Sequence, residues 1–350
     1  DFWEYDPITD VWSQKQNIAD IGTQYGRTGA VGFGIGNLGY FGTGNTSGSP
    51  NGTSNFYEYN PTTNLWTAKA NFAGGTRVSA VGFSIGNKGY IGTGTTNYAT
   101  LFNDFWEYNP TTDSWTQKAN FPGLSRDYAT GFSIAGKGYI GTGNDNSGIN
   151  ADDFYEYNPV TDSWSQKANF GGGKRFAASG FSIGSFGYIG MGQNSTNTEQ
   201  NDFWEYSSIN DTWTQRANFT GGIRYGVFSF SIGNKGYIGA GTYVSGGGVI
   251  ERNDFWQYSP QSNSWRRAYS DGMAVNVGAR LLEQRKSTLT TASSTAMVHI
   301  SRTDEAINEA MKSKGLNEIK SRGTQTPNAR YEGYRDGKHV ELPSTDSLRI

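Results

Sequence analysis

Residues 105–119 of the 350-residue chain read FWEYNPTTDSWTQKA, and this stretch decides the fold because close copies of it occur six times. Each copy begins with Phe-Trp/Tyr-Glu/Gln-Tyr, and a Trp always follows ten residues after the Phe. A fixed period near 49 residues indicates stacked supersecondary units. The copies begin at Phe2, Phe56, Phe105, Phe154, Phe203 and Phe255, and their Trp residues are Trp12, Trp66, Trp115, Trp164, Trp213 and Trp265.

Between the copies lies a second block, in which an Arg is followed thirteen residues later by a Tyr. Alternating β-branched and aromatic residues, punctuated by Gly, Asn, Asp and Pro, predict short strands in both blocks. In one repeat we expect four antiparallel strands, at residues 78–85, 89–93, 103–108 and 114–118, with a tight hairpin at Gly86 and Asn87. The Arg/Tyr pairs are Arg27/Tyr40, Arg77/Tyr90, Arg126/Tyr139, Arg175/Tyr188 and Arg224/Tyr237.

Four antiparallel strands per repeat, with an aromatic core running from unit to unit, predict an all-β fold, the β-propeller. The residues resemble the kelch-repeat propellers, in which a Tyr, a turn and a Trp stand at a fixed distance, as Tyr108 and Trp115 do here. The resemblance covers residues 1–267 and implies six blades. It departs from the family at Gly92-Thr93-Gly94, where paired glycines are usual. The uniform repeats are most similar to secreted, galactose-oxidase-like kelch proteins of bacteria, which implies an extracellular or cell-surface location.

The strand count leaves the ring incomplete, because the chain supplies five full blades and one half blade. Two interpretations stay open. Residues 268–350 provide divergent closing strands, or the chain is a fragment whose first strands precede Asp1, which is the interpretation we favour.

Residues 268–350 have a different composition, with 3 of the 51 aromatic residues and both His. We expect a small α+β or poorly ordered extension of unknown role. Its candidate elements are a helix at residues 303–314 and a hairpin at residues 331–342 about Asp336 and Gly337.

Composition excludes several classes of function. With no Cys anywhere and no His before His299, the copper site of the radical oxidases that share this fold cannot be built. A formal net charge of −2 argues against a nucleic-acid partner. No apolar run reaches the length of about 20 residues that a membrane span needs.

Three motifs suggest chemistry that their context does not support. Gly82-Phe83-Ser84-Ile85-Gly86 matches a nucleophile elbow, but it runs into a hairpin and has no His base. Gly34-Ile35-Gly36-Asn37-Leu38-Gly39 matches a dinucleotide motif but leads into a strand. The acidic loop at residues 144–153 has oxygen ligands suited to calcium, although Asp153 recurs in other repeats as a turn residue would. We therefore predict no cofactor, no metal and no catalytic residue.

Sequence variation points to one end of the propeller. In a four-stranded meander the loops between the second and third strands share an end with the loops between blades, and the former differ in every repeat. Such loops carry recognition on a rigid scaffold. At this end we expect a mouth lined by Arg27, Arg77, Arg126, Arg175 and Arg224, together with Asp127 and Tyr128.

Five guanidinium groups would attract carboxylates, so we expect a non-catalytic module that binds a protein, an acidic peptide or a glycan. A structural alternative is that each Arg pairs with the Glu of the third strand, namely Glu4, Glu58, Glu107, Glu156 or Glu205. An enzymatic alternative is a sugar mutarotase or lyase, for which Asp127 and Tyr128 are the local candidates. Enzymatic activity is thus less favoured than binding.

Overall fold

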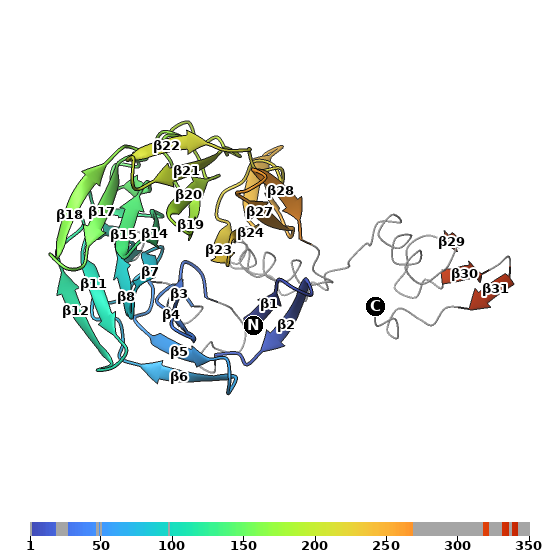
Figure 1. The fold of residues 1–350 in the computed structure, drawn as a ribbon, viewed down its shortest axis with the longest axis horizontal. Coiled ribbons are helices and arrows are strands. Elements are labelled where there is room, and N and C mark those ends of the chain that lie inside the picture. The colour runs from blue at the N-terminus through green and yellow to red at the C-terminus, as the bar shows by residue number, and fades with distance from the viewer. Residues whose placement is uncertain are drawn as a thin grey trace. The chain divides into compact units, whose positions relative to one another are not determined.

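The repeat region forms five four-stranded antiparallel sheets in the computed structural model, which describes residues 2–18, 27–46, 49, 51–96, 99–268, 318–321, 331–335 and 338–341. Figure 1 shows these sheets as blades that follow one another around a ring, so the fold is an all-β propeller. Within each blade we name the strands a to d in chain order. Blade 1 contains β3 (Val31–Ile35), β4 (Leu38–Gly42), β5 (Phe56–Asn60) and β6 (Leu65–Lys69); blade 2 contains β7 (Val81–Ile85), β8 (Lys88–Gly92), β11 (Phe105–Asn109) and β12 (Ser114–Lys118); blade 3 contains β14 (Thr130–Ile134), β15 (Lys137–Gly141), β17 (Phe154–Asn158) and β18 (Ser163–Lys167); blade 4 contains β19 (Ser179–Ile183), β20 (Phe186–Gly190), β21 (Phe203–Ser207) and β22 (Thr212–Gln215); and blade 5 contains β23 (Phe228–Ile232), β24 (Lys235–Gly239), β27 (Phe255–Ser259) and β28 (Ser264–Arg267).

Blade 2 confirms the four expected strands and refines their limits. The fourth strand is β12, at the predicted residues, and Gly86 has the positive φ of 58° that the hairpin requires. The first strand begins at Val81 rather than Val78, because Ser79 has a φ of 53° and interrupts the extended backbone. The chain therefore makes a sharp bend just before it enters the innermost strand.

Neighbouring blades pack large aromatic side chains against glycines. The Phe132 ring of β14 lies where a Cβ on Gly187 of blade 4 would stand, 2.2 Å from its nearest ring atom. The same fit joins Phe33 to Gly89, with a distance of 2.4 Å. The inner strands of adjacent blades contact one another, so one surface must be flat where the other carries a ring. This packing accounts for much of the glycine and aromatic content of the repeats.

A polar contact recurs at five junctions between neighbouring blades, beside the turn from strand c to strand d. Asp113 accepts hydrogen bonds from Tyr108 of its own blade (2.7 Å) and from the backbone N–H of Ala70 in the preceding blade (2.9 Å). Trp115 Nε1 donates to the Ala70 carbonyl at 3.0 Å. We call this set the junction staple, and it recurs with Asn64 and Trp66 on Gln16, Asp162 and Trp164 on Ala119, Asp211 and Trp213 on Ala168, and Asn263 and Trp265 on Ala217.

The half blade consists of β1 (Phe2–Asp6) and β2 (Val11–Lys15), which pair only with each other among the described residues. Its Tyr5 ring packs edge-on against Phe255 of blade 5, with 4.9 Å between centroids. Its Phe2 ring packs against Tyr59 of blade 1 at 4.7 Å. The half blade therefore lies between blade 5 and blade 1 and brings the two ends of the repeat region together. The expectation that residues 268–350 supply closing strands falls largely on residues 269–317, which lie outside the described residues.

The chain divides into two units, Asp1–Thr290 and Thr291–Ile350. In the second unit, β29 (Glu318–Ser321), β30 (Tyr331–Arg335) and β31 (Lys338–Glu341) form a three-stranded antiparallel sheet. The expected hairpin at residues 331–342 is confirmed by the pairing of β30 with β31. The expected helix at residues 303–314 lies outside the described residues. No helix in the described part of the chain is long and apolar enough to cross a membrane.

Candidate functional site

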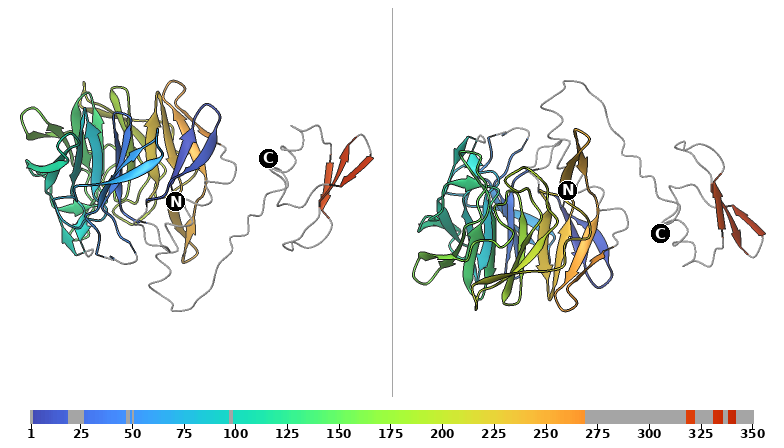
Figure 2. Two further views of the ribbon diagram at one scale, coloured as in Figure 1. Left: turned by 90° about the horizontal axis from the view of Figure 1, so that it is seen from below. Right: turned by 90° about the horizontal axis from the view of Figure 1, so that it is seen from above.

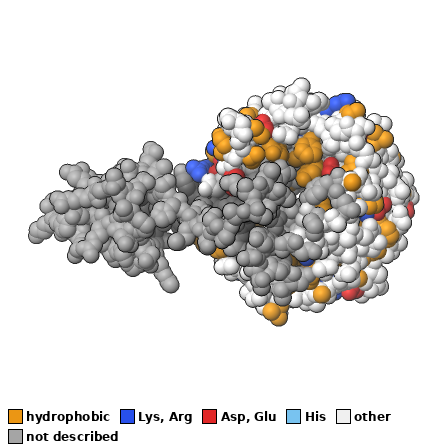
Figure 3. Space-filling model, turned by 180° about the vertical axis from the view of Figure 1, so that it is seen from behind, with side chains coloured by type: hydrophobic (Ala, Val, Ile, Leu, Met, Phe, Trp, Pro, Cys, Tyr) orange, Lys and Arg blue, Asp and Glu red, His pale blue; other side chains and the backbone are white. Residues whose placement is uncertain are grey.

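The candidate site is the end of the propeller that carries the loops between strands b and c, which we call the loop face. Figure 2 shows the propeller from two sides, with these loops at one end and the c–d turns at the other. Figure 3 shows the loop face, where hydrophobic side chains gather toward the middle of the ring and few charged groups are visible among the coloured residues. Two of the loops contain short ribbons, formed by β9 (Thr95–Thr96) with β10 (Thr100–Leu101) and by β25 (Thr242–Ser245) with β26 (Gly248–Glu251). In a third loop, β16 (Asn144–Asp145) pairs with β13 (Arg126–Asp127), which lies just before strand a of the same blade.

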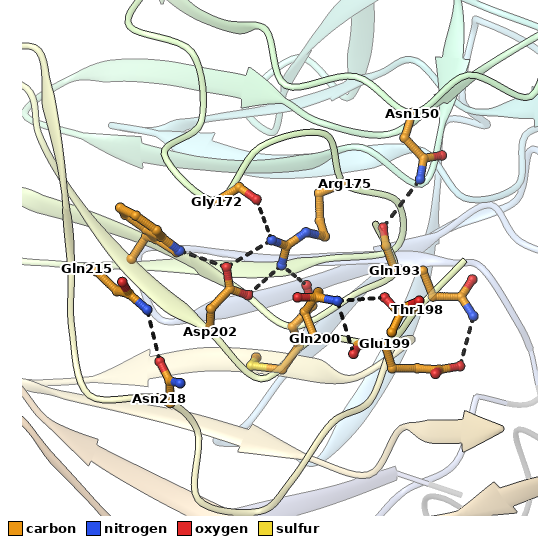
Figure 4. Close-up of polar contacts among 12 residues, drawn as sticks. Asn150, Gly172, Arg175, Gln193, Thr198, Glu199, Gln200, Asp202, Gln215 and Asn218 are labelled. Atoms are coloured by element: carbon orange, nitrogen blue, oxygen red, sulfur yellow. Dashed lines mark hydrogen bonds and ion pairs between the residues drawn. The ribbon is translucent and has the colours of Figure 1, made fainter. Parts of the chain in front are cut away.

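Beneath this surface, the repeated arginines of blades 2 to 5 are buried and paired. In blade 4 the Arg175 guanidinium donates two hydrogen bonds to the Asp202 carboxylate, at 2.6 and 2.9 Å, and a third to the Gly172 carbonyl (Figure 4). The exposed fraction of Arg175 is only 1%. The other pairs are Arg77 with Asp104, Arg126 with Asp153, and Arg224 with Asp254. A bidentate pair of this kind is strong and geometrically specific.

Each arginine also ties the end of strand b to the bend before strand a. Arg126 donates to the carbonyl of Thr142 at 2.9 Å, and Thr142 has a left-handed φ of 61°. The second Gly of this motif, Gly143, has a φ of 98° and approaches the Asp127 carbonyl too closely for a Cβ. The Gly-x-Gly departure from the family pattern therefore forms the turn whose carbonyl accepts the arginine hydrogen bond.

These contacts correct the predicted partner of the arginines. The partner is the aspartate that precedes strand c, whereas the Glu of strand c accepts a hydrogen bond from the strand b tyrosine, as Glu156 does from Tyr139 at 2.6 Å. In blade 1, where Asn55 occupies the aspartate position, Arg27 donates to the carbonyl of Thr43 at 3.1 Å. The ligand-binding role that the sequence suggests for the arginines stays a prediction, and in blades 2 to 5 their guanidinium groups are already used within the blade.

Above the arginines, the variable loops of neighbouring blades are joined by hydrogen bonds. Asn150 Nδ2 of blade 3 donates to the Asn194 carbonyl of blade 4 at 3.0 Å. The buried Glu199 of blade 4 accepts from Gln193 Nε2 at 3.0 Å (Figure 4). It also accepts from the Val244 backbone N–H of blade 5 at 3.3 Å. Thr96 of blade 2 likewise donates to the Asn51 carbonyl of blade 1 at 3.0 Å. These bonds join the variable loops of blades 1 and 2 and, separately, those of blades 3 to 5.

The hairpin of β25 and β26 groups three exposed apolar side chains on the loop face. Val244 is 48% exposed, Val249 is 52% exposed and Ile250 is 39% exposed. Gly246 and Gly247 have φ values of 59° and 78°, which suit the tight turn between the two strands. Apolar side chains grouped in this way are typical of an interaction surface.

Asp127 and Tyr128, the other predicted site residues, lie together at the bend before β14. Asp127 is partly buried, and burial raises the pKa of its carboxyl to about 6, while its own backbone N–H opposes this shift. Tyr128 has a left-handed φ of 50°, which is unfavourable for a bulky residue. The Tyr128 N–H donates to the Ser79 carbonyl of blade 2 at 3.1 Å, and its ring contacts Phe176 of blade 4 with centroids 4.7 Å apart.

Sequence inspection missed Phe176, Asn150 and Glu199 as parts of this surface. Phe176 directly follows a repeated Arg, as Asp127 does, so comparing that position across the repeats would have found it. Asn150 and Glu199 have no such signal because they lie in loops that differ between repeats. No group of three or more His, Asp or Glu residues that could hold a metal occurs within the described ranges, including the acidic loop at residues 144–153.

Comparison with known proteins agrees with the architecture. No protein-family model matches the chain, and no curated protein matches it. Among solved structures, the chain is similar to one described as the structure of YjhT, with a TM-score of 0.60 and 17% identity over 70% of this chain and 84% of that one. The shared feature is the β-propeller. At this identity the likeness shows the fold alone.

Proposed function

We propose that this chain is a kelch-type propeller with six blade positions, and that it acts as a non-catalytic binding module whose loop face recognises a protein, a peptide or a glycan. The observation that carries this proposal is the joining of variable loops from successive blades, as by Glu199 and Val244. A surface that is already ordered loses less conformational entropy when it binds. The secreted kelch proteins that the repeats resemble support an extracellular or cell-surface location, which is part of the proposal.

The proposal is tested by substitutions at opposite ends of the same scaffold. Val249→Asp and Ile149→Asp change loop-face side chains that are 52% and 53% exposed, whereas Val160→Asp changes a c–d turn side chain that is 88% exposed. The full chain is first screened on glycan and peptide arrays, and the affinity of each variant for the strongest ligand is then measured. We expect the two loop-face variants to weaken binding at least tenfold and Val160→Asp to leave it unchanged. Equal effects at the two ends, or arrays without any ligand, would contradict the proposal.

A second candidate function, a sugar mutarotase or lyase, is favoured by one observation. The Asp127 carboxyl has a pKa of about 6 and could accept or return a proton near neutral pH. The test is the anomerisation rate of sialic acid and uronic acids, followed by NMR with the wild-type chain and with Asp127→Asn. Acceleration by the wild type alone would support this function, and uncatalysed rates for both proteins would remove it.

A further inference from the structure

The position of Asp127 is apolar or small in the other blades. Each residue that directly follows a repeated Arg pairs through its backbone with the loop after strand b, as Asp127 does with Asn144. In blade 2 this residue is Val78, which is 1% exposed and packs where a Cβ of Gly29 in blade 1 would stand. In blades 4 and 5 it is Phe176 and Tyr225, and in blade 1 it is Thr28. Blade 3 alone places a carboxylate in this setting.

The Asp127 carboxylate has no cation beside it among the described residues. The nearest arginine in sequence, Arg126, directs its guanidinium to Asp153 instead. Asp145, opposite Arg126 in the β13–β16 ribbon, accepts the backbone N–H groups of Ser147 and Ile149 and therefore brings no cation to Asp127. A partly buried carboxylate with no counter-ion in the described part of the chain costs free energy there, so its place at a position that is apolar or small in the other blades suggests a task.

The next residue, Tyr128, has an unfavourable backbone conformation for its size. It adopts a φ of 50° with a large side chain, and its ring contacts the ring of Phe176. The equivalent residues of the other blades also have a positive φ but are small, namely Gly29, Ser79, Ala177 and Gly226. Strained residues that the fold could have avoided are concentrated at functional sites.

We propose that Asp127 and Tyr128 form a subsite for an organic cation, such as the side chain of Lys or Arg in a peptide. A cation supplies the charge that the carboxylate lacks, and the faces of the Tyr128 and Phe176 rings attract ammonium and guanidinium groups. The subsite rests on the proposed binding function and deepens it. It also reverses the sign that the sequence suggests, because aspartates neutralise the arginines of blades 2 to 5, whereas no described residue neutralises Asp127.

The test uses pentalysine and pentaglutamate peptides as probes, titrated into the full chain by calorimetry in low salt. We expect pentalysine to bind, pentaglutamate not to bind, and Asp127→Asn to weaken pentalysine binding at least tenfold. Asp152→Asn is the matched control, because it removes the same charge from the same face and should change the affinity less than twofold. Equal affinities in both variants, or preference for pentaglutamate, would overturn the subsite.

Two variants that copy the chain's own repeats separate binding from folding. Asp127→Val introduces the residue of blade 2 and Tyr128→Gly introduces the residue of blades 1 and 5. Each should abolish or weaken pentalysine binding while raising Tm, because one removes a partly buried carboxylate and the other relieves strain. A fall in Tm would instead show that these residues are structural. If Ile149→Asp and Val249→Asp abolish binding of an array ligand while Asp127→Asn leaves pentalysine binding intact, the cation subsite is wrong but the proposed binding function stands. If the arrays give no ligand, the proposed binding function is wrong as well.

Discussion

The two ends of the propeller hold the same blades but use their residues differently. At the c–d end, five junctions carry the same staple, with Asp or Asn bonded to a Tyr of its own blade and to the backbone of the preceding one. At the loop face, the loops are joined by contacts that differ from blade to blade, such as Asn150 to Asn194 and Glu199 to Val244. The repeat is therefore constant where blades must be held together and free to vary above that layer.

The repeated contacts and the variable positions lie on adjacent residues of the chain. Arg126 is 2% exposed and paired with Asp153, whereas the adjacent Asp127 differs from its counterparts in every other blade. Asp153 and Asp152 form a similar neighbouring pair, with one carboxylate in the ion pair and the other in a loop. Substitutions at such adjacent residues should have very different effects on stability.

The largest effect should come from Asp153→Ala. It leaves the Arg126 guanidinium buried without its carboxylate, which we expect to lower the free energy of unfolding by about 3–5 kcal/mol. Urea unfolding followed by tryptophan fluorescence measures the loss. The control is Asp152→Ala, one residue earlier, which should change stability by less than about 0.5 kcal/mol. Similar losses for the two variants would contradict this difference.

The repeat made the fold and the position of the loop face predictable. Spacing alone located the strands, since Phe105 and Trp115 stand at the same distance in all copies. It could not locate the partner of each arginine, because Glu107 and Asp104 both recur once per repeat and only the three-dimensional path of strand b shows which carboxylate is reached. The contacts between loops were beyond prediction because they join residues about 45 apart that follow no repeated pattern.

The next largest effect on stability is expected in the packing of rings against glycines between neighbouring blades. Gly187→Ala would place a Cβ 2.2 Å from the Phe132 ring, so we expect a loss of about 1–3 kcal/mol from overpacking. Gly32→Ala is the control on an inner strand, where the nearest described atom, the Tyr40 carbonyl oxygen, would lie at an ordinary 3.6 Å. Calorimetry should give a lower Tm for Gly187→Ala than for Gly32→Ala. A Gly187→Ala protein as stable as Gly32→Ala would show that the ring can move aside.

A smaller effect is expected at the junction staple. Asp162→Ala removes the acceptor of the buried Tyr157 hydroxyl and of the Ala119 N–H, which should cost about 1–2 kcal/mol. Asp162→Asn should be nearly neutral, because Asn263 fills the same position in blade 5 and accepts the same two bonds. Urea unfolding of the two variants provides the comparison. Equal losses for Ala and Asn would mean that the carboxylate charge, rather than the acceptor oxygen, holds the junction.

The pH dependence of the staple sharpens this test. Burial alone would raise the pKa of the Asp162 carboxyl. Hydrogen bonds from Ala119 and Tyr157, together with the nearby Lys118, outweigh this effect and hold that pKa below its ordinary value. A lowered pKa in the folded state stabilises the protein above the unfolded value of about 4, and this contribution is lost as the pH falls. The wild type should therefore lose stability relative to Asp162→Asn only below about pH 4.

The smallest effect on global stability should come from Glu199→Ala, which acts on the loop face alone. The Glu199 carboxylate holds the Val244 N–H of the β25–β26 hairpin, so its loss should speed hydrogen exchange of that amide about tenfold, the equivalent of one charge-assisted hydrogen bond. The free energy of global unfolding should change by less than about 0.5 kcal/mol, because the hairpin opens locally without the blades. Glu199→Gln keeps an acceptor oxygen and should keep the amide protected. Slower exchange at Val244 in the Ala variant, or a loss of unfolding free energy as large as that of Asp153→Ala, would show that the loop contacts belong to the scaffold. The expected result would show that the loop face is ordered by its own contacts and can change its ligand without changing the fold.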